Sequence, residues 1–348
     1  MIDGSQGEGG GQILRSSLAL SCITGRPFRI VSIRAARPKP GLRPQHLVSV
    51  RAAAKLTEAE VEGATVGSSE LEFRPGPICA GTYCFDIGTA GAVSLVLQTV
   101  LLPAFRASST VTFHLTGGTH VPFSPAFDYL ALQFGYWLKR MGLHTSFTLA
   151  RAGYYPTGGG SVRTEIEPAA RIAPLLLKDR GSLVRIFGIS AISNLPTHVA
   201  ERQQLRAERI LREAGYKADI ELRSLPSHGQ GTMLLLSAEF ERTRATYFSL
   251  GARGKPAEKV AKEAATELLR FLESDATVDE HAADQIMLPL AIADGESVYR
   301  VLEITQHAET HAEVIRRFLP AEVTLSGGVG EPGEIRIRGC PLPACAPR

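Results

Sequence analysis

The chain of 348 residues has little of several features that would assign it to a class. Its five cysteines are an odd number with no CxxC pair, which argues against a disulfide framework and a zinc knuckle. No apolar run approaches the ~20 residues that span a bilayer, and the acidic, glycine-rich N-terminus is unlike a signal peptide. The net charge is only +3, so no global field indicates a nucleic-acid partner. We therefore expect a cytoplasmic protein without membrane contact.

Two common nucleotide-binding motifs, GK[ST] and GxGxxG, are also missing. Residues 4–15, GSQGEGGGQILR, nevertheless place several glycines ahead of a predicted helix. Backbone N–H groups there would be open to an anion, which the helix dipole favours. Glu8 would repel a phosphate unless a divalent cation lay between them, because hard cations take oxygen ligands. The alternative interpretation is a flexible glycine turn.

The rest of the chain shows a repeated pattern in three segments. Helical and strand periodicities alternate as β-α-β-α-β-β within residues 1–180 and 276–339, and the first and third units are less complete. Two helices can cover one face of each sheet, and three such units can pack with their helices inward. The sequence thus predicts an α/β fold in which these residues form one large catalytic domain.

Residues 181–275 break this rhythm. They contain the strand-like LVRIFGISAIS and two charged amphipathic helices, which indicates a small α/β domain inserted between the second and third units. Residues 340–348, CPLPACAPR, are expected to form a C-terminal tail.

Cationic and isolated polar residues mark candidate binding positions. RAARPKPGLRPQH, residues 34–46, carries several basic residues in a proline-stiffened loop, which suits phosphate binding by arginine, although a solvated surface is the alternative. Asp284 and Gln285 lie in an otherwise apolar predicted helix, and Gln98 lies in another. Asp284 and Gln285 are expected either to cap a turn or to face a ligand at the end of the helix, whereas Gln98 faces a ligand or occupies a partly exposed position.

His307 and His311 are four residues apart, a spacing at which two imidazoles on one helix can share a metal ion. Thr310 and Glu313 fit a capping box, which predicts that the helix begins at about residue 310. His307 would then lie in the preceding loop, off the helical face of His311. This placement weakens the metal interpretation and leaves a nucleophilic or a structural role for His307.

Seven stretches in order resemble the RNA 3′-terminal phosphate cyclase family: DGSQGEGGGQILR, RAARPKPGLRPQHL, IGTAGAVSLVLQTVLLP, LTGGT, GYYPTGGG, ADQIMLPLA and HAETHAEVIRRFL. The resemblance spans nearly the whole chain. It implies three β-α-β-α-β-β units with a small domain inserted before the third. It also implies that ATP and Mg²⁺ or Mn²⁺ are used to convert an RNA 3′-phosphate into a 2′,3′-cyclic phosphate.

The resemblance also implies roles for individual residues. His307 would attack ATP and become a covalent histidine–AMP, the AMP would pass to the RNA 3′-phosphate, and the 2′-hydroxyl would then expel it. Glu8 matches the family's metal-associated carboxylate. Further matches assign Arg15, Arg34, Arg37 and His46 to the RNA phosphate, and Gln98, Pro125, Asp284 and Gln285 to the nucleotide, with Tyr247 or Phe248 covering the adenosine.

Two positions depart from the family pattern. His281 stands where relatives commonly have a tyrosine that stacks on adenine, and His311 stands where they have asparagine. The retained His307 argues against a second hypothesis, a non-catalytic relative in ribosome assembly. A third, an enolpyruvyl-type transferase, requires six units, whereas this chain has room for about three. The sequence is compatible with a monomer or a homodimer.

Overall fold

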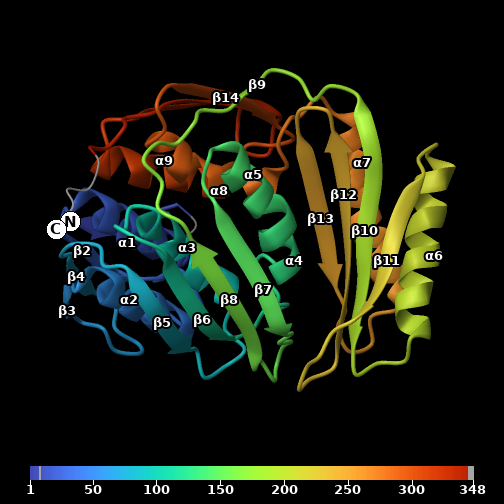
Figure 1. Ribbon diagram of the computed structural model, residues 1–348, viewed down its shortest axis with the longest axis horizontal. Helices are drawn as coiled ribbons and strands as arrows, with labels where there is room; N and C mark the ends of the chain where they lie inside the picture. The colour runs from blue at the N-terminus through green and yellow to red at the C-terminus, as the bar shows by residue number, and fades with distance from the viewer. Residues whose placement is uncertain (8, 344–348) are drawn as a thin grey trace.

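The computed structural model describes residues 1–7 and 9–343, which form four sheets of four strands each (Figure 1). Three of these sheets share one topology. The first unit comprises β1 (Ile2–Asp3), α1 (Gln12–Thr24), β2 (Phe28–Val31), α2 (Pro44–Thr57), β3 (Glu60–Glu62) and β4 (Leu71–Arg74). Its strand order is β1-β2-β4-β3, with β1 and β2 parallel and the other pairs antiparallel.

The second unit repeats this order as β5-β6-β8-β7, again with its first two strands parallel. Its elements are β5 (Gly81–Asp86), α3 (Val93–Ala104), β6 (Val111–Gly117), α4 (Phe127–Tyr129), η1 (Leu130–Phe134), α5 (Gly135–Arg140), β7 (Thr145–Arg151) and β8 (Gly160–Ile166). The second helix of the unit is thus one continuous helical stretch, α4–η1–α5, with a π-helical turn at its centre.

The third unit has the same order, β9-β14-β16-β15. Its elements are β9 (Leu176–Leu177), α8 (Glu280–Ala291), β14 (Glu296–Val301), α9 (Gln306–Phe318), β15 (Glu322–Ser326) and β16 (Gly333–Arg338). Because β9 precedes the inserted segment, that segment interrupts the third unit after its first strand. The sequence-based placement between the second and third units was therefore wrong, since a two-residue strand carries no readable pattern.

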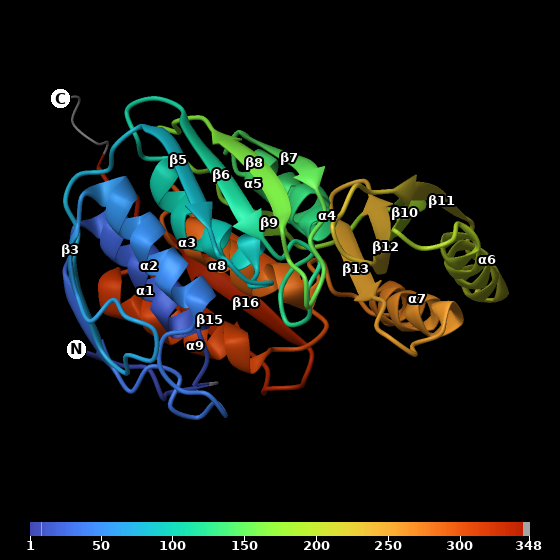
Figure 2. The same ribbon diagram turned by 90° about the horizontal axis from the view of Figure 1, so that it is seen from below.

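The helices of the three units lie inside and their sheets lie outside (Figure 2). Helix α1 packs against α2, α3 and α9, and α8 packs against α9. The apolar residues of α1 are buried around nearly its whole circumference, as is typical of a helix enclosed by others. The predicted α/β architecture with inward helices is confirmed. No helix in the described part of the chain combines the length and apolar character that a membrane crossing needs.

The inserted segment forms the fourth sheet, in the order β11-β10-β12-β13. Its elements are β10 (Leu183–Ser193), α6 (His198–Glu213), β11 (Ala218–Ser224), β12 (Gly231–Phe240), β13 (Arg244–Leu250) and α7 (Ala257–Glu273). Since side chains alternate along a strand, Leu234 and Leu236 face one core with α6 and α7. Met233 and Leu235 face the other side and pack with Tyr129 of the second unit.

A buried polar network joins the inserted sheet to the second and third units. Asp279, the N-cap of α8, accepts hydrogen bonds from the Tyr129 hydroxyl at 2.7 Å and from Nε2 of Gln133 at 2.6 Å. Gln133 also donates to the Arg244 carbonyl and accepts from the Thr246 hydroxyl, both on β13. The start of α8 is thereby fixed relative to two other parts of the protein, the second unit and the inserted sheet.

Candidate active site

A cavity of about 980 Å³ lies where the units meet the inserted sheet. Four helices of the described chain, α1, α2, α8 and α9, begin at its wall. Each helix contributes two residues from its N-terminal end to the lining: Gly11 (the N-cap) and Gln12 of α1, Gln45 and His46 of α2, Glu280 and His281 of α8, and Thr305 (the N-cap) and His307 of α9. Because helix N-termini carry partial positive charge and unpaired N–H groups, their convergence favours a polyanionic ligand.

His307 lies in the first turn of α9 rather than in a loop. The helix begins at Gln306, because the hydroxyl of Thr305 accepts the backbone N–H of Ala308 at 3.1 Å and caps it. The Thr310 hydroxyl donates to the Gln306 carbonyl at 2.8 Å, as it does inside a helix. The predicted start at residue 310 was therefore wrong, and His307 and His311 lie one turn apart on the same helix.

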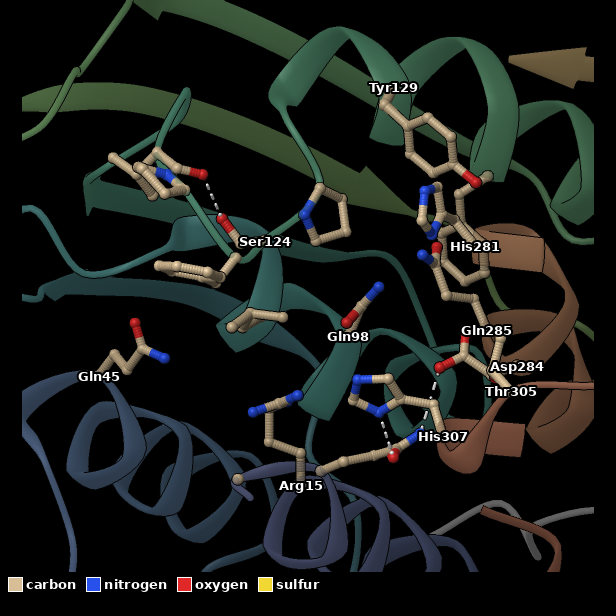
Figure 3. A pocket seen from close by; sticks show the side chains of 18 of the residues that line it. Arg15, Gln45, Gln98, Ser124, Tyr129, His281, Asp284, Gln285, Thr305 and His307 are labelled. Atoms are coloured by element: carbon tan, nitrogen blue, oxygen red, sulfur yellow. Dashed lines mark hydrogen bonds between the residues drawn. The ribbon is translucent and has the colours of Figure 1, made fainter. Parts of the chain in front are cut away.

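The orientation of His307 is set by Gln12 of α1 and Asp284 of α8 (Figure 3). Nε2 of Gln12 lies 3.2 Å from Oδ2 of Asp284, and the other end of the amide, Oε1, lies 2.7 Å from Nδ1 of His307. An ionised carboxylate only accepts, so the amide nitrogen faces Asp284 and the amide oxygen faces the ring. Nδ1 must therefore carry the hydrogen, which leaves the lone pair of a neutral imidazole on Nε2.

Asp284 occupies a half-buried position at the cavity wall. The pKa of its carboxyl is raised, chiefly by burial, although the nearby His307, His281 and Arg15 partly offset the rise. The hydrogen bond from the Gln12 amide to Oδ2 of Asp284 links the three side chains Asp284, Gln12 and His307 in a row.

His311 is buried, and its ring approaches the backbone of Asp284 without a well-formed hydrogen bond at either ring nitrogen among the described residues. Burial lowers its pKa to about 4, the contact with the Asp284 backbone opposes this, and the neighbouring His307 and Arg15 lower the pKa further. The ring is thus neutral near pH 7. Among residues 1–7 and 9–343, no cluster of three or more His, Cys, Asp or Glu side chains could hold a metal ion. Glu8, the expected metal-associated carboxylate, lies outside the described residues.

The four residues expected at the RNA phosphate all line the cavity: Arg15, Arg34, Arg37 and His46. His46 is buried, and its Nδ1 accepts the backbone N–H of Arg43 at 3.3 Å. Burial lowers its pKa to about 3, helped by Arg15, Arg34 and Arg43. A neutral ring whose Nδ1 accepts must carry its hydrogen on Nε2, so His46 is an uncharged donor beside the arginines.

Two features of this end depend on backbone geometry. A Cβ on Gly11 would collide with Nε2 of His46 and lie 2.8 Å from Nη1 of Arg15, so glycine permits the close approach of both side chains. Arg34 has a φ of 55°, and its Nη1 donates to the carbonyls of Lys39 and Gly41. Arg34 therefore closes its own loop as well as lining the cavity.

Six of the seven residues expected around the nucleotide line the cavity: Gln98, Pro125, Phe248, His281, Asp284 and Gln285. Tyr247 is not among the lining residues, because it points to the opposite face of β13 from Phe248. Its hydroxyl donates to Glu280 at 2.8 Å, and its ring lies 6.3 Å from that of His281. Of the pair Tyr247 or Phe248, only Phe248 is placed to contact a ligand.

Gln285 carries a signal of its own. Its Oε1 is buried and has no hydrogen-bond partner among the described residues, although the side chain lines the cavity. Buried acceptors in native structures are nearly always satisfied. A ligand that donates a hydrogen bond here would satisfy the atom.

Sequence reasoning did not single out three parts of this wall. Gln12 was quoted only within the glycine-rich motif, and its bond to His307 joins residues 295 positions apart. Phe123 received no role. Lys255 lines the cavity beside β13, where its ammonium donates to the Ser249 hydroxyl and the Leu250 carbonyl, both at 2.9 Å. Only an isolated aromatic between prolines could have marked Phe123 in the sequence.

The chain is similar to known proteins along nearly its whole length. The family model described as RTC, RNA 3′-terminal phosphate cyclase, matches residues 6–325. Proteins named RNA 3′-terminal phosphate cyclase from Methanopyrus kandleri and Pyrococcus furiosus are each 45% identical, over 97% of this chain and 98% of their own lengths. A protein of the same name from Methylococcus capsulatus is 44% identical over 99% of this chain and 98% of its own.

Proposed function

The chain belongs to the RNA 3′-terminal phosphate cyclase family, and on this premise we propose that it uses ATP to close an RNA 3′-phosphate into a 2′,3′-cyclic phosphate through a covalent AMP on His307. A phosphate monoester lacks a good leaving group for ring closure. Transfer of AMP supplies one, and passage through an enzyme nucleophile divides the transfer into two easier steps.

In the first step, Nε2 of His307 attacks the α-phosphorus of ATP, and the bond from that phosphorus to the bridging oxygen breaks to release pyrophosphate. The hydrogen bond from Nδ1 to Gln12 supports this assignment, because it directs the lone pair to Nε2. The converging N-termini of α1, α2, α8 and α9 would stabilise the negative charge of the triphosphate.

In the second step, an oxygen of the RNA 3′-phosphate attacks the phosphorus of the histidine-bound AMP and frees Nε2. In the third, the neighbouring 2′-hydroxyl attacks the RNA phosphorus, loses its proton and expels AMP. Arg15, Arg34 and Arg37, with the neutral His46, supply the donors that would hold the RNA phosphate.

We propose that Gln98, Pro125, Phe248, His281 and Gln285 bind the nucleoside of ATP, with Asp284 beside them. The unpaired Oε1 of Gln285 suits a donor such as an exocyclic amine. His281 is exposed and could stack its imidazole on the adenine. The family resemblance places a tyrosine at this position, and an imidazole offers a smaller stacking surface.

A divalent cation, Mg²⁺ or Mn²⁺, would enter with ATP and neutralise charge on the departing pyrophosphate. The described carboxylates of the cavity already have partners: Asp284 accepts from Gln12, Glu280 from Tyr247 and Glu263 from Ser249. We propose Glu8 as the residue that contacts the cation together with ATP oxygens, because the family resemblance assigns a metal-associated carboxylate to this position.

The chain Asp284–Gln12–His307 beside the phosphate-binding side chains is the observation that carries the proposal. The test combines purified protein, ATP labelled at the α-phosphate and an RNA ending in a 3′-phosphate. Wild type should take up acid-labile label without RNA, and with RNA it should yield a phosphatase-resistant cyclic end. His307→Ala should do neither. Wild type that forms no cyclic end would refute the proposed function.

A further inference from the structure

An exposed aromatic side chain stands in the cavity wall. Phe123 lies in the loop between β6 and α4 and is fully exposed, although it lines the cavity. The other large apolar side chains that are exposed in the described chain, such as Tyr155 and Val329, lie outside this wall. Single exposed apolar side chains are common on protein surfaces, but this ring lies in the wall of the cavity, where the face of a ligand base could stack on it.

The loop holds Phe123 in place instead of letting it turn inward. The Phe127 N–H donates to the Thr119 carbonyl at 2.9 Å, and the Ser124 hydroxyl donates to the Val121 carbonyl at 3.0 Å. Within this closed loop Phe123 has a φ of 63°, a conformation that bulky side chains rarely adopt. Backbone strain of this kind persists where the surroundings impose it, and it is concentrated at ligand sites.

Phe123 lies two residues before Pro125, which is proposed to contact the nucleoside, and therefore borders the nucleotide end of the cavity. Figure 3 shows Ser124, its neighbour, on the same side as Gln45, whereas His281 and Gln285 lie on the opposite side. The exposed Arg37 also lines the cavity and adds charge for a nucleic-acid backbone. Single-stranded ends are held in this way, by stacking on aromatic side chains and by cations along the backbone.

We propose that Phe123 is the stacking platform for the nucleobase at the 3′ end of the RNA substrate, an inference that rests on the function proposed above. With the 3′-phosphate among Arg15 and His46, the base of the same nucleotide would lie on the exposed ring. Stacking tolerates any base, because every base has a π-face. The platform would thus contribute affinity for RNA ends without selecting their sequence.

The test compares two RNAs with a 3′-phosphate, one with a normal terminal nucleotide and one whose terminal nucleotide is abasic. The KM of wild type for the first RNA should be lower by roughly 5- to 150-fold, the range for one stacked base. Phe123→Ala and Phe123→Leu should bind both RNAs like the abasic one, and Phe123→Trp should restore the preference. Self-adenylation measured without RNA should be equal in all four proteins.

Two controls keep the result interpretable. Glycine adopts a positive φ without strain, so the unfolding temperature of Phe123→Gly should be no lower than that of wild type. The preference for the RNA with a terminal base should nevertheless be lost. Tyr155→Ala removes an exposed aromatic outside the cavity wall and should change neither property. A preference that persists in Phe123→Ala, or slower adenylation without RNA in that variant, would overturn this inference alone. Wild type without adenylation or cyclisation would instead refute the proposed function.

Discussion

Oε1 of Gln12 accepts a hydrogen bond from Nδ1 of His307 at 2.7 Å, while the other end of the same amide donates to Asp284. Because Asp284 on α8 holds the amide nitrogen of Gln12, the amide oxygen faces the His307 ring on α9 and accepts the hydrogen on Nδ1. His307 therefore has a defined tautomer with the lone pair on Nε2. A residue that acts in this way positions the nucleophile without touching the reacting atoms.

Gln12→Leu should therefore slow single-turnover self-adenylation by roughly 10- to 100-fold, as expected for loss of an orienting partner. The KM for ATP should change little, because Gln12 is not proposed to bind the nucleotide. Gln204→Leu, which removes an amide on α6 outside the cavity, is the matched control and should adenylate like wild type. Equal rates in both variants would show that the hydrogen bond does not orient His307.

His311 should make stability depend on acid pH. Its folded pKa is about 4, below the ordinary value of 6.5, so between these values the unfolded chain binds the proton and the folded one does not. This contribution to stability is then complete above pH 6.5, falls steadily between pH 6.5 and 4, and is fully lost below pH 4.

Denaturant unfolding of wild type and His311→Asn measures the pH-dependent contribution of His311 to stability. At pH 5 the free energy of unfolding of wild type should have fallen by about 2 kcal/mol relative to pH 8, beyond any change in the variant. The same pH dependence in both proteins would contradict the neutral, buried state of His311.

Gly11→Ala should disrupt the phosphate end of the cavity. The added Cβ would collide with His46 and crowd Arg15, so one or both must move. Displacement of about 1 Å at a reacting centre can cost on the order of 10²-fold in rate, and we expect a loss of this size in RNA cyclisation. Gly135→Ala, whose Cβ meets only an ordinary 3.4 Å contact with Phe147, should retain full activity. Full activity of Gly11→Ala would refute the role of this close packing.

Tyr129→Phe should lower the free energy of unfolding by about 1–3 kcal/mol, because buried Asp279 loses a donor at 2.7 Å. Tyr136→Phe removes a hydroxyl whose 3.4 Å bond to the Arg242 carbonyl is exposed, and it should cost less than about 0.5 kcal/mol. Chemical denaturation of both variants distinguishes the two positions. Equal effects would mean that the network between the inserted sheet and α8 adds no stability.

The architecture was predictable from the sequence because long amphipathic helices and hairpins repeat with readable periods. The short strands β1 and β9, two residues each, were not, and so the third unit was expected to begin after the inserted segment. The start of α9 was missed because Thr305 and Thr310 both fit a capping residue, and the choice between them depends on which hydroxyl faces a free backbone N–H.

The basic loop of residues 34–46 could be expected at a binding site from its composition, and Arg34, Arg37 and His46 line the cavity. The nucleophilic role predicted for His307 came from the family resemblance, because the residue type alone left a structural role open. The candidate site was not predictable where packing decides. The alternation of β13 turns Tyr247 away from the cavity and Phe248 toward it, and only the register of the sheet fixes that choice. The contact of Gln12 with His307 requires α1 and α9 to be packed together.

The most direct measurement identifies the atom that carries AMP. Wild type is adenylated with ATP labelled at the α-phosphate, digested under alkaline conditions that preserve phosphoramidates, and analysed by mass spectrometry and NMR of the modified histidine. AMP should be found on Nε2 of His307, and His311→Asn should be modified at the same atom. AMP on Nδ1, on another residue or on none would contradict the account.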